Sequence, residues 1–435
     1  MQLFFVLYLM LLSTEVSTLG GHYSRELRRG GVRLPLATKG SPRSRDFAFN
    51  LYRALASADP GHNIFFSPLS ISVSLAMLSL GARSHTKMQI LKGLGLRLRD
   101  SPEEALHRAF QQCLQTLNGS QNDLQLSLGN ALFTDQKLDV QDSFLNSVKV
   151  LYLADTFPSN FGDPAKAKKQ INDYVAKQTK GKIVDLIKDL DSDSVMVLVN
   201  YVFFKAKWKA SFNRKNTQEK PFYVNSETVV QVPMMNHEDL FYYFEDLHLS
   251  CKVVGIPYQG NATALFILPN VGSMEQVENG LNGKTLQKWF KLFRRRQLQV
   301  YLPRFSIEGS YQLEKVLPQL GIREVFTSKA DLSGITNHSS VHVSEMVHKA
   351  VVEVDESGTK AASATGSVIM FRSAYRRNSK VVFNRPFLML IMEQRTKGIL
   401  FLGKVTHPEV GTSSERPQAP MKGNGKSPRP HLSAE

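Results

Sequence analysis

GTKAASATGSVIMFRS, residues Gly358 to Ser373, is a run of small side chains that ends at one basic residue, Arg372, followed by a serine. If Thr359 points inward, alternation along a strand places the early charge, Lys360, on the opposite face. The inward positions are then Thr359, Ala361, Ser363, Thr365, Ser367 and Ile369. This pattern predicts a strand that can insert between closely packed neighbours without burying a charge. A low-complexity surface linker is the alternative for this stretch taken alone.

One further strand candidate and two apolar runs of strand length flank this stretch. Val351 to Glu356 precedes it, whereas Phe383 to Ile391 and Leu400 to Val405 follow it. The two later runs are separated by a polar turn at Glu393 to Gly398, a pattern typical of paired buried strands. The small-residue stretch is therefore suspended between strands, which argues against the linker.

Several separate blocks between about Asp46 and Pro408 resemble the serpin family. Asn63 to Ile71, together with Ser74 to Met77, is similar to the first buried helix of that family. Asn200 to Trp208 is similar to a central strand, and His348 to Thr359 is similar to the hinge. The hinge residues that the resemblance implies are Glu356, Gly358, Thr359, Ala361, Ala362, Ser363 and Ala364.

The resemblance implies one α+β domain over residues 46–408, although 435 residues would allow two or three domains. The expected serpin fold has a large central, mainly antiparallel sheet A, with sheets B and C and about nine helices. It also has an exposed reactive-centre loop at about 357–378. A hydrophobic content of 42% is ample for such a core.

The resemblance also implies a suicide inhibitor of serine proteases and no enzyme. A trypsin-like protease would attack the bond between Arg372 and Ser373, with Phe371 tuning the choice of protease. The implied targets are trypsin-like enzymes such as activated protein C, thrombin, kallikreins, plasminogen activators and acrosin. A non-inhibitory serpin that acts as a carrier or glycosaminoglycan-binding protein is the alternative, but the small hinge residues favour inhibition.

Five positions match polar and aromatic residues that support the opening of the sheet in the family. They are Ser67, Ser70, Asn200, Trp208 and His348. The resemblance implies that they control the barrier to opening and do not touch the protease. Ordinary buried, hydrogen-bonded core groups are the alternative for Asn200 and His348.

A second pattern, from Gly283 to Gln297, predicts an amphipathic basic helix. At about 100° per residue, Lys284, Lys288, Lys291 and Arg295 fall within a stripe of about 60°. The opposite side carries Leu286, Trp289, Phe290 and Phe293, and the basic side is reinforced by Arg294 and Arg296. With no acid expected to neutralise it, this face is predicted to bind heparin or a related glycosaminoglycan. A merely soluble surface is the alternative, and no specific nucleic acid is expected.

The two ends of the chain differ in composition from its interior. Residues 1–19 have the apolar run of a signal peptide, which predicts a secreted, extracellular protein. A buried N-terminal element is the alternative, because no Lys or Arg precedes the run. Residues 20–45 are expected to be a mobile basic arm and 409–435 a disordered tail. Three sequons, at Asn118, Asn261 and Asn337, are candidate glycosylation sites. Past the first residues no apolar run reaches about 18 residues, so no transmembrane segment is expected.

Other chemistry is not supported by the sequence. Cys113 and Cys251 are expected to be two separate thiols in a helix and a strand, and they provide no metal site. His237-Glu238 begins like a zinc-protease motif, but Phe241 stands where the second ligand is needed. The protein is predicted to be a monomer that needs no cofactor. Its formal charge of +16 predicts that a polyanion binds it as a modulator.

Overall fold

The computed structural model describes residues 43–96, 103–118, 124–357, 379–394 and 398–409. The predicted signal peptide, almost all of the basic arm and the tail from residue 410 lie outside these ranges. The arm was expected to extend to Arg45, but the first described helix already begins at Arg43. The acidic Asp46 in its first turn suits the positive end of the helix dipole.

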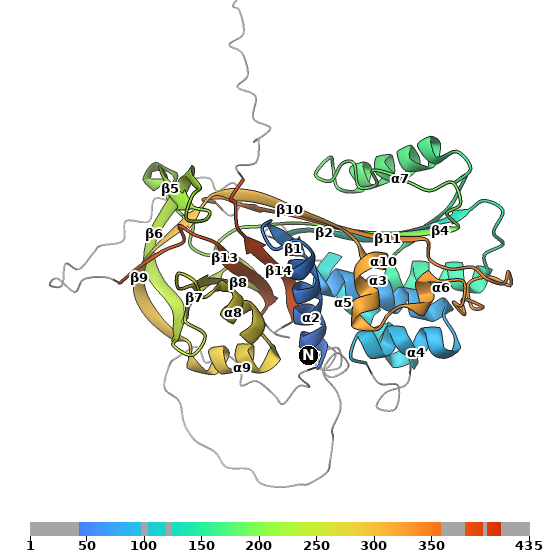
Figure 1. The fold of residues 1–435 in the computed structure, drawn as a ribbon, viewed down its shortest axis with the longest axis horizontal. Helices are drawn as coiled ribbons and strands as arrows, with labels where there is room; N and C mark the ends of the chain where they lie inside the picture. The colour runs from blue at the N-terminus through green and yellow to red at the C-terminus, as the bar shows by residue number, and fades with distance from the viewer. Residues whose placement is uncertain (1–42, 97–102, 119–123, 358–378, 395–397, 410–435) are drawn as a thin grey trace, which may run out of the picture.

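Helices make up most of one half of the molecule (Figure 1). None of the described helices is long and apolar enough to cross a membrane. The α-helices of the described ranges are α2 (Arg43–Ala58), α3 (Pro68–Gly81), α4 (Ser84–Gly93), α5 (Glu103–Asn118), α6 (Asp142–Tyr152), α7 (Pro164–Gln178), α8 (Met274–Gly280), α9 (Gly283–Leu292) and α10 (Leu313–Val316). Short 3-10 helices are η1 (Arg214–Asn216), η2 (Leu317–Leu320) and η3 (Glu324–Phe326).

The strands of the described ranges form two sheets. The strands are β1 (Ile64–Phe66), β2 (Leu124–Asp135), β3 (Asp155–Ser159), β4 (Met196–Ala206), β5 (Gln218–Tyr223), β6 (Val229–Asp246), β7 (Cys251–Pro257), β8 (Ala262–Pro269), β9 (Arg294–Pro303), β10 (Phe305–Gln312), β11 (Glu345–Val354), β12 (Ser379–Val382), β13 (Phe387–Glu393) and β14 (Ile399–Val405). The strands expected near residues 200, 351 and 400 are therefore present.

The five-stranded sheet has the order β10-β11-β4-β2-β3 and corresponds to the predicted sheet A. Its outer pair β10–β11 and its inner pair β4–β2 are antiparallel. The β11–β4 and β2–β3 pairs are parallel, so these strands form a mixed sheet and not a mainly antiparallel one. The parallel β11–β4 pair lies at the centre, where the chain of β11 leads directly toward residue 358.

The nine-stranded sheet combines the predicted sheets B and C. Its main order is β1-β14-β13-β8-β7-β6-β9-β12, and β5 pairs with β6. Because the 18-residue strand β6 pairs with β7 near its end and with β5 and β9 along its length, it belongs to both parts. One long strand thus joins two sheets that were expected to be separate.

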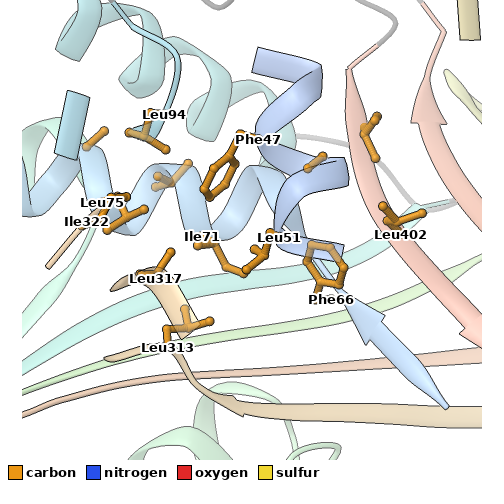
Figure 2. Close-up of a cluster of buried hydrophobic side chains, with 14 of the residues drawn as sticks. Phe47, Leu51, Phe66, Ile71, Leu75, Leu94, Leu313, Leu317, Ile322 and Leu402 are labelled. Carbon is orange, nitrogen blue, oxygen red and sulfur yellow. The ribbon is translucent and has the colours of Figure 1, made fainter. Parts of the chain in front are cut away.

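Helix α3 is buried at the centre of the molecule, between the sheets and the other helices. Ser67 caps its first turn by accepting a hydrogen bond from the Ser70 amide, and Pro68 has the φ angle that a helix start needs. Ile71 and Leu75 belong to one buried cluster with Phe47 and Leu51 of α2 (Figure 2). Burial of each such large side chain stabilises the fold by about 1.5–3 kcal/mol.

Helix α7 covers the opposite face of the five-stranded sheet (Figure 1). Asp163 caps it by accepting a hydrogen bond from the Lys166 amide. Ile171 and Val175 on its inner face belong to one buried cluster with Val199 of β4 and Val351 of β11. The central β4–β11 pair is therefore packed on both faces.

Candidate functional site

The candidate site is the junction between the parallel strands β4 and β11. Its register runs from the pair Val197 and Glu345 to the pair Phe204 and Val352. The residues expected to enter it, Gly358, Thr359, Ala361, Ala362, Ser363 and Ala364, lie outside the described residues. The predicted reactive bond Arg372–Ser373 and its neighbour Phe371 lie outside them as well. The structure therefore describes the predicted place of insertion and the end of β11 that precedes residue 358.

Trp208, two residues after the end of β4, contacts the chain where it leaves β11. The Trp208 indole donates a 2.8 Å hydrogen bond to the carbonyl of Asp355, and its backbone N–H donates to Ser357. The ring is 1% exposed and stacks on Tyr258 with centroids 4.2 Å apart. A buried aromatic side chain thus lies at the point where an inserting strand would begin.

Glu356, the described member of the predicted hinge, is also anchored. Its side chain is buried and accepts a 2.8 Å hydrogen bond from the Thr217 hydroxyl. The Arg304 guanidinium lies 3.7 Å from the same carboxylate oxygen. The Glu356 carbonyl accepts a hydrogen bond from the Phe212 amide at 2.8 Å. The hinge therefore begins from a fixed position at the top of β11.

A buried polar cluster crosses the middle of the junction. Asn200 of β4 and His348 of β11 are directly paired in the register, and both are 0% exposed. The Asn200 amide donates to the Ser70 hydroxyl at 2.6 Å and to Asn130 Oδ1 at 2.7 Å. Ser67 joins the cluster because its backbone N–H donates to His348 Nε2 at 3.1 Å. The four polar residues expected to support sheet opening are thus brought together, whereas their role remains a prediction.

The hydrogen bonds define the tautomer of His348. Since Nε2 accepts from the Ser67 backbone, the proton of the neutral ring is on Nδ1, which donates to Asn200 Oδ1. Full burial lowers the pKa of His348 to about 3. Protonation would place an uncompensated charge beneath the sheet and would remove the acceptor of the Ser67 hydrogen bond.

Acidification is expected to destabilise the protein through His348. Because the folded pKa lies below the unfolded value, its contribution is complete above about pH 6.5 and falls as the pH decreases toward 3. At pH 5.5 the loss from this group is about 1.4 kcal/mol relative to pH 7.5. Urea unfolding at both pH values measures it. His348→Gln is expected to show a smaller difference, and equal differences would contradict the assignment.

The basic region is not one continuous helix, although the sequence analysis predicted one. Helix α9 ends at Leu292, and Arg294, Arg295 and Arg296 begin strand β9. Asn282 caps the helix by accepting a hydrogen bond from the Thr285 amide, while Leu286 and Trp289 are buried beneath it. The helical prediction was right for Lys284, Lys288 and Lys291, which are exposed. It was wrong for the three arginines, because backbone pairing with β6 gives them an extended conformation.

An acidic residue does lie against the basic helix, although the sequence analysis expected none there. Asp246, at the end of β6, is 1% exposed and accepts hydrogen bonds from Lys288 Nζ at 2.9 Å and from the Trp289 indole at 2.8 Å. Burial opposes its ionisation, but these two hydrogen bonds hold the pKa of Asp246 below its ordinary value. Lys288 is therefore neutralised and helps to anchor α9. Asp246 lies 42 residues from Lys288 in the chain, so helical periodicity offered no signal for it.

The three arginines of β9 do not share one face. In the antiparallel register Arg295 is opposite Tyr242, and its guanidinium lies 5.8 Å from that ring. Arg296 has the other orientation and lies 5.3 Å from the Tyr243 ring. Arg294 donates to the carbonyl groups of Lys291 and Phe293 at the end of α9. The basic surface is thus a helix with a flanking strand, and not one continuous helical stripe.

The structure also shows the surroundings of the predicted glycosylation sites and of the two cysteines. Asn261 and Asn337 are exposed, and Asn118 is the last residue of α5. Cys113 and Cys251 are free cysteines in α5 and β7, which confirms two separate thiols. Burial raises the pKa of each thiol to about 12. Within the described ranges, no group of three or more His, Cys, Asp or Glu residues could hold a metal ion.

A mixed five-stranded sheet with a parallel central junction, joined to a larger sheet and flanked by nine described helices, is the architecture of a serpin. The chain belongs to the serpin family, described as serine protease inhibitors, whose model matches residues 42–408. This membership confirms the predicted fold and the prediction of a protease inhibitor in place of an enzyme.

Known proteins that are similar to this chain support the assignment. It is 65% identical over 409 residues to plasma serine protease inhibitor from Homo sapiens, with 94% of this chain and 100% of the relative covered. The protein of the same name from Bos taurus is 63% identical over 408 residues, with 94% and 100% covered. The structure of human thyroxine-binding globulin has a TM-score of 0.80 and 41% identity, covering 85% of this chain and 98% of that one.

Proposed function

We propose that this serpin is a secreted, heparin-regulated suicide inhibitor of trypsin-like serine proteases that is cleaved between Arg372 and Ser373. The name of its human and bovine relatives supports a plasma location and a serine protease target. The observation that carries the mechanism is the parallel β4–β11 junction, from which β11 leads directly to the small-residue stretch.

Protease specificity follows from the side chain before the cleaved bond. The acidic specificity pocket of a trypsin-like enzyme accepts Arg372, and its serine attacks the Arg372 carbonyl to form an acyl-enzyme. The new amino group at Ser373 leaves with the downstream segment. Phe371 and Ser373, on either side of Arg372, tune the choice among proteases such as thrombin, activated protein C, kallikreins, plasminogen activators and acrosin.

The junction offers a stabilising place for the cleaved segment. A segment that turns back after β11 runs antiparallel to β11 and, because β4 is parallel to β11, also antiparallel to β4. Insertion therefore replaces one parallel pairing with two antiparallel ones, which are slightly more stable per residue and doubled in number. Loop insertion of this kind is a known mode of sheet augmentation in serpins. The acylated protease would be carried along and distorted before water can release it.

A gel experiment tests the proposal. Mixing the protein with thrombin or trypsin is expected to give an SDS-stable band near the summed masses, which Arg372→Ala abolishes for both enzymes. A cleaved chain without this band would favour the alternative, a carrier serpin that is a substrate of the protease. Retention of heparin binding by Arg372→Ala, with no complex in the wild type, would favour a glycosaminoglycan-binding protein.

The proposed polyanion site consists of Lys284 and Lys291 on α9 and of Arg294, Arg295 and Arg296 on β9, with Lys288 at its edge. These side chains are exposed on adjoining elements. One heparin chain bound here and to the protease would raise the local concentration of each partner for the other.

Reversing the charges of Lys284 and Lys291 to glutamate is expected to reduce the heparin-accelerated inhibition rate about tenfold and to leave the heparin-free rate nearly unchanged. Second-order rates with and without heparin measure this. Lys149→Glu on α6, far from α9 in Figure 1, is the matched control and should lose little acceleration. Equal losses with and without heparin would contradict the assignment of the site. Lys288 is unsuitable because its replacement also removes the partner of Asp246.

Three further features belong to the same proposal. Residues 1–19 are proposed to direct secretion and to be removed. Asn118, Asn261 and Asn337 are proposed glycan acceptors, for which the exposed positions of Asn261 and Asn337 are favourable. The inhibitor is proposed to act as a monomer that needs no cofactor besides the glycosaminoglycan modulator.

A further inference from the structure

Four charged side chains gather at the upper end of the β4–β11 junction, just beyond the last pair of the register. Glu353 of β11 and Lys205 of β4 directly follow the paired residues Val352 and Phe204. Lys205 Nζ lies 2.8 Å from one oxygen of the Glu353 carboxylate and 3.7 Å from the Asp355 carboxylate. A charge pair therefore connects the two strands that must separate if a strand is to enter.

A third element is connected to the same carboxylate. Lys182 belongs to the segment between α7 and β4, and its Nζ lies 2.8 Å from the other oxygen of Glu353. The same ammonium lies 5.4 Å from the centre of the Phe203 ring of β4. Glu353 thus holds β4, β11 and the segment that follows the covering helix α7 in one place.

The cluster is only partly accessible to water. The Glu353 side chain is 25% exposed and the Lys205 side chain 20%, whereas Lys182 is 40% exposed. Burial opposes the ionisation of Glu353, but hydrogen bonds from Lys182 and Lys205 hold its pKa below the ordinary value. Although burial disfavours its charge, the hydrogen bond to Glu353 raises the pKa of Lys205. Partial shielding makes such a network stronger than a fully solvated ion pair.

Opening of the junction acts directly on this cluster. Neighbouring strands lie about 4.8 Å apart, so one inserted strand moves β4 and β11 to about twice that separation. The 2.8 Å contact between Lys205 and Glu353 then has to break or stretch across the incoming strand. By contrast, Lys349 of β11 and Glu308 of β10, 3.3 Å apart, stay on neighbouring strands throughout.

We propose that Lys182, Lys205, Glu353 and Asp355 form a charge latch that holds the entry of the junction closed and limits the rate of sheet opening. The contribution of the latch to protease trapping rests on the proposed function, whereas its effect on opening does not. The latch lies on the α7 side of the sheet, as strand alternation with Val351 and Phe203 requires.

Hydrogen exchange in the uncut protein tests the latch without any protease. Glu353→Gln keeps the size of the side chain and removes its charge. It is expected to speed exchange of the amides at the upper ends of β4 and β11 about fivefold, since local opening becomes easier. Glu308→Gln is the matched control, because it breaks a lysine–glutamate pair of the same sheet that does not cross the junction. The control should leave these amides at the wild-type rate.

Lys205→Met, which keeps much of the stem volume, provides a second variant. Lys205→Met is expected to act in the same direction as Glu353→Gln, and the double variant should be less than additive because both changes remove one interaction. Exchange no faster than in Glu308→Gln, or full additivity, would overturn the latch.

The limiting rate of SDS-stable complex formation at saturating protease adds the functional readout. Glu353→Gln is expected to raise this rate about fivefold, in step with exchange. Faster exchange without a faster limiting rate would overturn the regulatory role. If neither wild type nor variants form a complex, the proposed function fails, and the exchange data still decide whether the latch controls opening.

Discussion

Replacing Thr359 by arginine is expected to leave cleavage after Arg372 intact and to abolish trapping, so that the inhibitor becomes a substrate. In the register that buries no charge, Thr359 enters the junction on the face of Val202 and Val352, both fully buried. An unpaired guanidinium in that layer costs several kcal/mol. Insertion therefore slows, and water releases the active protease first.

The measurement is the ratio of SDS-stable complex to cleaved chain after reaction with trypsin or thrombin. Thr359→Arg is expected to give at least about a hundredfold lower ratio than the wild type. A rise of about 2.7 kcal/mol in the barrier to insertion, relative to the barrier to hydrolysis of the acyl-enzyme, is enough for this change. Lys360→Arg is the matched control, because alternation leaves residue 360 on the other face, and its ratio should stay near that of the wild type. A high yield of complex with Thr359→Arg would contradict both the register and the insertion step.

The second large effect is expected for Asn200→Ala at the centre of the junction. Removal of the amide leaves Ser70 Oγ and His348 Nδ1 buried without a partner. It also removes one of the two donors to Asn130 Oδ1, which keeps only the Ser74 hydroxyl. Unsatisfied buried polar groups cost about 1–3 kcal/mol each before relaxation, so a loss of about 3 kcal/mol in unfolding free energy is expected.

Urea unfolding at pH 7.5 measures this loss. Asn172→Ala is the control, because the Asn172 side chain bonds to the backbone of Ile187 near α7 and not across the junction. Its expected loss is about 1 kcal/mol. A loss for Asn200→Ala no larger than that of the control would show that the cluster contributes little to holding β4 and β11 together.

In the basic region, the spacing of the residues predicted the helix correctly but not the point where the helix ends. Lys284, Lys288 and Lys291 recur with helical spacing over the buried Leu286 and Trp289, and the structure has a helix there. The same spacing extended to Arg295 by coincidence. The alternation of Leu298, Val300 and Leu302, all buried, is the signal of strand β9. Pairing with β6 overrides the local helical pattern because each paired residue gains backbone hydrogen bonds to a neighbouring strand.

The sequence by itself determined the family and predicted the hinge and the sheet-support residues, because these depend on residue types at fixed spacings along the chain. Only the tertiary structure decided which charges meet: Asp246 with Lys288, and Glu353 with Lys182 and Lys205. The physical reason is that an ion pair depends on a separation of a few ångströms in space. Lys182 and Glu353 are 171 residues apart in the chain, and only the packing of the α7 segment onto the sheet brings them together.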